Sequence, residues 1–153
     1  MADKPGFDAD RAHKFFAAHC FNAAWQLIDK SDRTADDNEQ MIRLAQASMW
    51  HWTQRPDCTN KNLSIGYWQA SRVYALVGEA ENARKYAQLC LDKTPRDEPF
   101  YLGYAYEALA RAAAMAGERD KVKQYLAEAR QNAARVTDEE ERQVLSGDLK
   151  TLE

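Results

Sequence analysis

Three histidines and three cysteines are the side chains of this chain best suited to metal binding or nucleophilic catalysis. His13 and His19 stand six residues apart, about 240° around a helix, so they point to different faces. No His-x-x-x-His pair occurs, and the cysteines lack the Cys-x-x-Cys spacing of thiolate zinc sites. We therefore expect no metal and no cofactor. His13, His19 and His51 are predicted to be partly buried packing residues, although three converging histidines would also suit a helical metal hydrolase.

Covalent catalysis has little support in the sequence. Cys20 and Cys90 fall in helical apolar patterns and are expected in the core. Cys58 is predicted in a polar connection with no histidine near it in the sequence. Neither a Gly-x-Ser-x-Gly elbow nor a Gly-rich phosphate loop occurs. The acidic run Asp138 to Glu141 fits the first turn of a helix, and we expect a protein that is not an enzyme.

Length and charge limit the partners. The chain has 153 residues, 45% of them hydrophobic, and a net charge of -3, which fits one domain over residues 1–153. Basic and acidic residues alternate throughout, so the clustered cations that bind nucleic acid are not expected. No apolar stretch is long enough to span a bilayer, and the first residues lack the apolar region of a secretory signal. We expect a cytoplasmic protein with no membrane contact.

The helical pattern begins after residues 1–8, which are polar and predicted to be loose. The chain is rich in alanine and poor in Val and Ile, which favours an all-α fold. Residues 9–54 are predicted to form a divergent N-terminal helical hairpin, with Thr34 as the N-cap of its second helix. Pro56 ends that helix, and residues 54–62 form a polar connection.

The second half of the chain repeats itself. Gly78 and Gly117 each follow an apolar helical segment, and they stand 117 − 78 = 39 residues apart. The same offset aligns Tyr67 with Tyr106, Ser71 with Ala110, and Ala87 with Leu126. Two helix-turn-helix units are therefore predicted, with each glycine in a left-handed C-terminal cap.

These units resemble the tetratricopeptide repeat, whose period is about 34 residues. The first unit reads Tyr67-x-x-Ala70-Ser71-x-x-Tyr74, then Gly78, Ala83, Tyr86-Ala87, Cys90 and Pro95. The second unit has Tyr106, Leu109-Ala110, Gly117, Val122, Leu126 and Ala129. Tyr replaces the motif's Trp, and the offset exceeds the usual period. The resemblance covers residues 63–134 and implies stacked antiparallel helical hairpins in an α-α superhelix. Residues 137–152 would form a C-terminal capping helix, opened by a capping box from Thr137 to Glu140.

The resemblance also implies a binding face. In proteins similar to tetratricopeptide repeats, positions 2, 5, 9 and 12 of the first helix of each unit line a concave groove, counted here from Ser64 and Gly103. These positions hold Ile65, Trp68, Arg72 and Ala75, then Tyr104, Glu107, Arg111 and Ala114. Two arginines beside aromatic rings suit a carboxylate ligand. An alternative is that Glu107 pairs with Arg111 as an ordinary i, i+4 surface interaction.

We therefore expect a non-catalytic scaffold that binds a protein or peptide, through an acidic segment or a C-terminal carboxylate. The expected binding residues are Trp68, Arg72, Tyr104, Glu107 and Arg111, together with His51 from the run Met49-Trp50-His51-Trp52. One alternative is a small-molecule-binding or metal-dependent helical enzyme with a pocket near His51 and Trp68. Another is a homo-oligomer whose aromatic groove is filled by a second copy of the chain.

Overall fold

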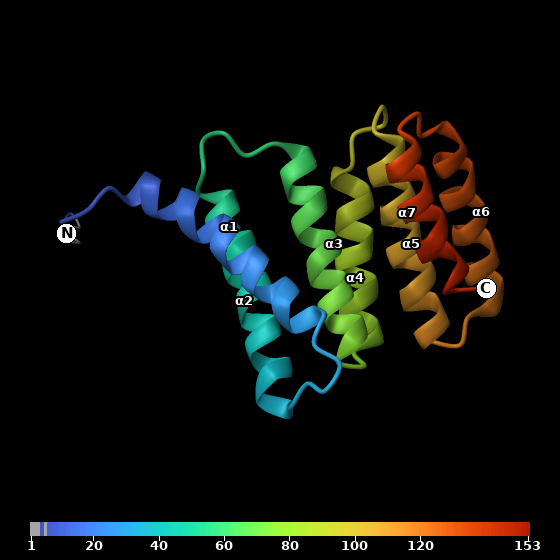
Figure 1. Ribbon diagram of the computed structural model, residues 1–153, viewed down its shortest axis with the longest axis horizontal. Helices are drawn as coiled ribbons and strands as arrows, with labels where there is room; N and C mark the ends of the chain where they lie inside the picture. Colours follow the sequence, from blue (N-terminus) through green and yellow to red (C-terminus); the bar gives the residue numbers. More distant parts are fainter. Residues whose placement is uncertain (1–3, 5) are drawn as a thin grey trace. The chain divides into compact units, whose positions relative to one another are not determined.

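A computed structural model describes Lys4 and residues 6–153, and within them it contains seven α-helices and no strand (Figure 1). The prediction of an all-α fold built from helical hairpins is confirmed. The helices are α1 (Ala9–Ile28), α2 (Ala35–Thr53), α3 (Asn60–Leu76), α4 (Ala80–Lys93), α5 (Pro99–Met115), α6 (Arg119–Arg135) and α7 (Glu139–Lys150).

The chain forms two compact units, the first ending at Thr59 and the second spanning Asn60–Glu153. The expectation of one domain over residues 1–153 stays a prediction. Of the residues predicted to be loose, 1–3 and 5 lie outside the described part of the chain, while Gly6 to Asp8 precede the first helix. No described helix is long and apolar enough to cross a membrane.

The first unit is a hairpin of α1 and α2. Asp8 caps α1 by accepting a hydrogen bond from the Arg11 backbone N–H. Thr34 caps α2 as predicted, in a capping box with Asp37 in which each side chain accepts a backbone N–H of the other residue. Small residues let the two helices approach closely, and the buried Ser48 hydroxyl donates to the Ala17 carbonyl at 2.8 Å.

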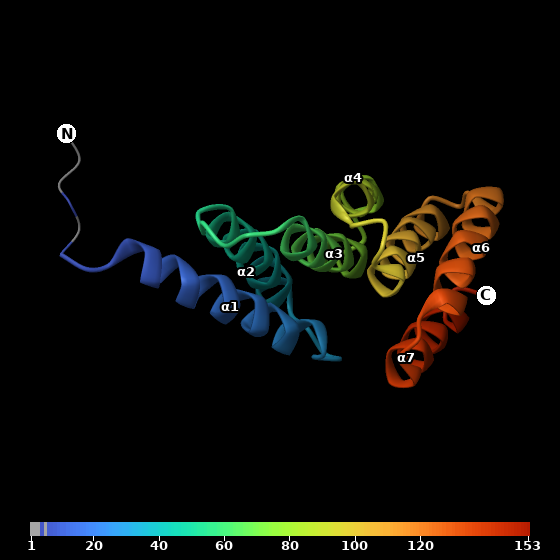
Figure 2. The same ribbon diagram turned by 90° about the horizontal axis from the view of Figure 1, so that it is seen from above.

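The second unit contains two hairpins and a final helix. The pairs α3 with α4 and α5 with α6 pack as hairpins, and α5 also contacts α3, α4 and α7. Figure 2 shows α4 above and between α3 and α5, and α7 below α5 and α6. Buried alanines and leucines fill the space between these helices, and one cluster of buried residues comprises Ala110, Leu126, Ala129, Ala133, Val136, Leu145 and Leu149.

The turns of the two hairpins are equivalent. Gly78 and Gly117 have φ angles of 84° and 73°, which confirms the left-handed caps predicted for them. In each turn the glycine N–H bonds to a carbonyl three residues back, and the following Glu N–H bonds to one five residues back, which is the Schellman pattern. The hairpins also begin 99 − 60 = 39 residues apart, so the sequence offset is an offset between equivalent helices.

The start of the last helix differs from the prediction. Asp138, not Thr137, is the N-cap of α7, and its side chain accepts the Glu141 backbone N–H at 2.9 Å. The capping box predicted from Thr137 to Glu140 was therefore wrong, since α7 begins one residue later than that box requires. Thr and Asp both suit an N-cap, and placing the cap at Asp138 leaves Val136 buried against the core.

Candidate functional site

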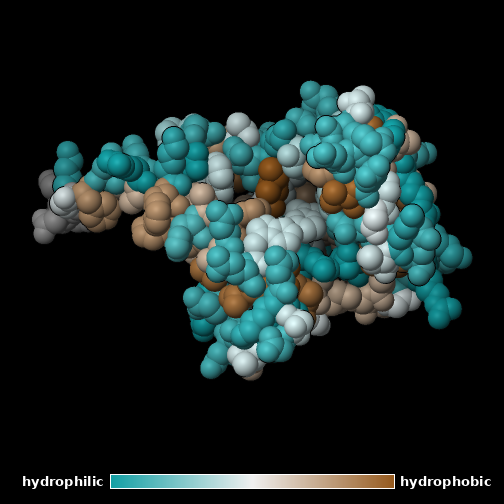
Figure 3. Space-filling view, viewed as in Figure 1, coloured by the Kyte–Doolittle hydropathy of each residue, from teal (hydrophilic) through white to brown (hydrophobic). Residues whose placement is uncertain are grey.

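Five of the six predicted site residues lie in the second unit, on α3 or α5. Trp68 and Arg72 are one turn apart on α3, and Tyr104, Glu107 and Arg111 follow one another on α5. Because 107 − 68 and 111 − 72 both equal 39, Trp68 is equivalent to Glu107, and Arg72 to Arg111, in the two hairpins. We call the surface carrying these residues the α3–α5 face. In Figure 3, brown and pale side chains gather over α3, and mostly hydrophilic ones lie over α7.

Glu107 is at the centre of a carboxylate network formed with Trp68 and Arg111. Glu107 is only 1% exposed. The Trp68 indole Nε1 donates to Glu107 Oε2 at 3.1 Å, and Arg111 Nε donates to Oε1 at 2.8 Å. A second guanidinium nitrogen of Arg111 also contacts Oε1. Both carboxylate oxygens are thus occupied inside the protein, so Glu107 is suited to positioning its two neighbours rather than to contacting a ligand.

The network explains how a carboxylate tolerates burial. An ionised carboxylate loses hydration when it is buried, and only close counter-charges and hydrogen bonds offset that loss. The Arg111 side chain supplies the charge and keeps 21% of its own surface exposed. A guanidinium has more N–H donors than Glu107 uses, so Arg111 retains donors for a further acceptor.

Aromatic rings flank this network. The rings of Trp68 and Tyr104 meet edge to face with centroids 5.5 Å apart, and Phe100 meets Tyr104 in the same way at 5.1 Å. The Tyr104 hydroxyl donates to Asp148 Oδ2 of α7 at 2.6 Å. Burial, together with the hydrogen bond to Asp148, raises the pKa of Tyr104 above its usual range. Tyr104 is therefore a neutral donor that joins α5 to α7.

Two of these contacts were missed by sequence reasoning. Asp148 lies three residues after Leu145 and one before Leu149, both of which are buried, so the helical register of α7 placed it next to the inward stripe. Phe100 lies one turn before Tyr104 on α5, and that spacing was available in the sequence too. Neither residue belongs to the groove positions that the repeat resemblance implies.

His51 belongs to the first unit, where its partner is His13 of α1. Their Nδ1 atoms lie 2.9 Å apart, so one ring donates its N–H to the unprotonated nitrogen of the other. Phe16 stacks on His51 with centroids 5.4 Å apart, and Trp50 contacts both histidines edge to face. His13 and His51 are half-buried as predicted, whereas His19 is exposed and stacks on Phe15, so its predicted burial was wrong.

Stability of the first unit is expected to fall in mild acid because of this pair. Loss of hydration and the nearby His13 hold the pKa of His51 below its ordinary value of 6.5. The unfolded chain then binds a proton more readily than the folded one, so this stability is complete above pH 6.5 and is lost as the pH falls through the lower folded pKa. Melting temperatures measured by circular dichroism from pH 7.5 to 5 should decrease, and they should decrease less in His51→Gln. His19→Gln is the matched control. If the melting temperature of that variant depended on pH as weakly as that of His51→Gln, the loss of stability could not be assigned to His51.

The described residues contain no group of three or more His, Cys, Asp or Glu side chains arranged to hold a metal ion. Cys20 and Cys90 are buried, as predicted, and Cys58 is half-buried. Burial raises the pKa of all three thiols, and that of Cys90 to about 11. The thiol form therefore predominates at neutral pH, which disfavours nucleophilic attack by these cysteines.

Comparisons of the chain with protein-family models, with curated proteins and with solved structures found no match. The arrangement on the α3–α5 face offers a held guanidinium and two half-buried aromatic rings. Such groups bind carboxylates and apolar side chains.

Proposed function

We propose that the chain is a non-catalytic scaffold that binds a protein or peptide through the α3–α5 face, and that Arg111 receives a carboxylate of the partner. The observation that carries the proposal is the buried Glu107, which holds both Arg111 and Trp68 by hydrogen bonds. A guanidinium held in place loses little side-chain entropy on binding, so more of its interaction energy remains as affinity.

The composition of the face supports a macromolecular partner. Trp, Tyr and Arg are the residues that most often dominate the energy of protein interfaces, because each combines a large apolar surface with hydrogen-bond donors. Trp68, Tyr104 and Arg111 are all half-buried, and their neighbours hold them in position. Arg72, also half-buried, lies one turn beyond Trp68 and adds a second cation on α3. A C-terminal carboxylate fits this set better than a neutral ligand, because a carboxylate accepts two N–H bonds from one guanidinium.

The test compares two pools of fluorescent peptides, one with free C-terminal carboxylates and one with C-terminal amides. We expect the carboxylate pool to bind more tightly. We expect Arg111→Lys to weaken that binding about tenfold to a hundredfold, since Lys keeps the charge beside Glu107 but lacks the planar fork. Fluorescence polarisation gives both affinities, and Arg43→Lys is a matched control on an exposed arginine of α2. Equal affinity for the two pools, or an unchanged affinity in Arg111→Lys, would remove the basis for a carboxylate-binding face.

A further inference from the structure

The helix α6 has one face that combines cationic and apolar side chains. Arg119, Lys123, Leu126, Arg130 and Ala134 follow one another at helical spacing, so they share a stripe along the helix. From the first to the last arginine of this stripe the axial distance is about 16 Å. Helix α7 ends at Lys150 after 12 residues, whereas α6 has 17, so α7 is too short to cover all of α6.

Two cavities lie along this stripe. One, of about 680 Å³, lies between α6 and the end of α5, with Val122, Leu126 and Leu152 as its apolar lining. The other, of about 320 Å³, lies between α6 and α7, with Ala133, Ala134 and Leu149 as its lining. Arg130 and Glu153 line both cavities. The two hollows therefore adjoin, and we call them together the cationic groove.

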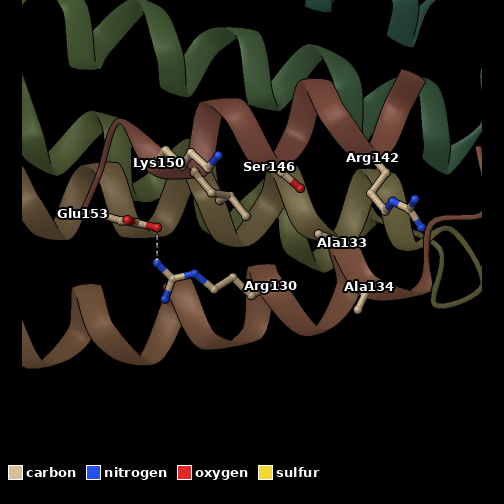
Figure 4. Close-up of a pocket in the computed structure, with 8 residues that line it drawn as sticks. Arg130, Ala133, Ala134, Arg142, Ser146, Lys150 and Glu153 are labelled. Atoms are coloured by element: carbon tan, nitrogen blue, oxygen red, sulfur yellow. Dashed lines mark hydrogen bonds and ion pairs between the residues drawn. The ribbon is translucent and has the colours of Figure 1, made fainter. Parts of the chain in front are cut away.

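Charge in the cationic groove is strongly one-sided, although the whole chain carries a net charge of -3. Its cations are Arg119, Lys123, Arg130, Arg142 and Lys150, and its single acidic side chain is Glu153. Figure 4 shows Arg130 on α6, Arg142, Ser146 and Lys150 on α7, and the ion pair between Arg130 and Glu153.

Three of the five groove cations form no ion pair within the described part of the chain, whereas Arg142 pairs with Glu139 of its own helix. Arg130 pairs with Glu153 at 2.7 Å, but both side chains are half-exposed, at 51% and 53%. An exposed pair of this kind contributes little and exchanges readily. Among the described residues, no carboxylate lies within ion-pair distance of Arg119, Lys123 or Lys150.

We propose that the cationic groove binds an acidic, amphipathic peptide segment of a partner protein, at a place separate from the α3–α5 face. The cations along α6 recur at helical spacing, so a helical segment with carboxylates at the same spacing matches them over about 16 Å. Val122 and Leu152 are half-buried and Ala134 is exposed beside the cations, so these side chains contact the apolar stripe of such a segment. A nucleic acid would satisfy the cations but leave the half-buried Val122 and Leu152 against a hydrophilic backbone, so the peptide is the better match.

The probe is a synthetic helical peptide of about 16 residues with Glu at the spacing of the α6 cations and Leu in the adjoining stripe. Two matched peptides replace either all Glu by Gln or all Leu by Ser, and a single-stranded oligonucleotide of similar length is the fourth ligand. Affinities are measured by fluorescence polarisation at about 50 mM and 300 mM salt, since screening weakens exposed ion pairs. We expect the parent peptide to bind at least about tenfold more tightly than either matched peptide, and more weakly at high salt.

The protein variant is Arg119→Glu combined with Lys123→Glu, which should weaken binding of the parent peptide about tenfold or more. Arg43→Glu combined with Lys85→Glu changes the net charge equally at exposed positions outside the groove and should bind like the wild type. Circular dichroism shows whether each variant is folded. Equal binding of the Gln peptide, equal loss in both double variants, or an oligonucleotide that binds as tightly as the parent peptide would each overturn the proposal.

Discussion

Glu107→Ala is expected to lower the free energy of unfolding by about 3 kcal/mol, near the lower end of what breaking a buried ion pair costs. The substitution leaves the Trp68 indole N–H and the Arg111 guanidinium without their acceptor. Arg111 keeps partial exposure, so water relieves part of its loss. For a chain of this size the loss corresponds to a decrease in melting temperature of about 6–12 °C. Urea and thermal unfolding followed by circular dichroism give both quantities.

Two further variants distinguish a buried network from an ordinary surface pair. Glu98 forms an ion pair with Lys61 at 3.1 Å and is 35% exposed, so Glu98→Ala should cost only about 0–1 kcal/mol. The double variant Glu107→Leu with Arg111→Met removes both charges together and should recover much of the stability lost in Glu107→Ala. If Glu107→Ala costs no more than Glu98→Ala, the network does not stabilise the second unit.

Local features of the sequence predicted the elements and part of this network. The left-handed turns at Gly78 and Gly117 favour a residue without a Cβ, and an apolar helix ends before each of them. Both turns could therefore be predicted from the sequence. The alternative pairing of Glu107 with Arg111 was also readable, because residues four apart on a helix are neighbours. The structure contains that pair, but at a buried carboxylate rather than at the surface.

The depth of Glu107 was not predictable from its own helix. The repeat resemblance assigns it to a groove position, but its burial depends on Trp68, which approaches from α3 and donates to it across the stack. The distance between α3 and α5 depends on all the small residues packed between them, and no single spacing in the sequence encodes it. The contact between His13 and His51 was not predictable for the same reason, because it depends on the register in which α1 packs against α2.

Helices α5 and α7 approach each other closely at Gly103. A Cβ added at Gly103 would overlap Leu145 Cδ2, and Leu145 is 0% exposed. Leu145 is therefore held in a space that exists because residue 103 has no side chain. The repeat resemblance counts Gly103 as position 1 of its unit, outside the groove positions, and it implies nothing about this contact.

Leu145→Ala is expected to cost about 3 kcal/mol, within the range for deleting a buried leucine side chain. The loss of stability comes from burying less apolar surface and from the cavity left beside Gly103. The substitution weakens the packing of α7 against α5. Thermal and urea unfolding measure the change. Val144→Ala, at a neighbouring residue of α7 that is 56% exposed, is the control and should change stability by less than about 0.5 kcal/mol.

The effect of Gly103→Ala on the free energy of unfolding should have opposite signs in the wild-type and Leu145→Ala backgrounds. In the wild-type background the new Cβ overlaps Leu145, and the overpacking, about 1–3 kcal/mol, outweighs the roughly 1 kcal/mol that Ala gains over Gly in a helix. In the Leu145→Ala background the Cβ enters vacated space, so Gly103→Ala should stabilise. Gly147 is exposed on α7, and a Cβ added there would have nothing within 4 Å. As a control, Gly147→Ala should therefore stabilise both backgrounds by about 0.5–1 kcal/mol. A double-mutant cycle of unfolding free energies measures the coupling. Additive effects of Gly103→Ala and Leu145→Ala would mean that residues 103 and 145 do not compete for the same space.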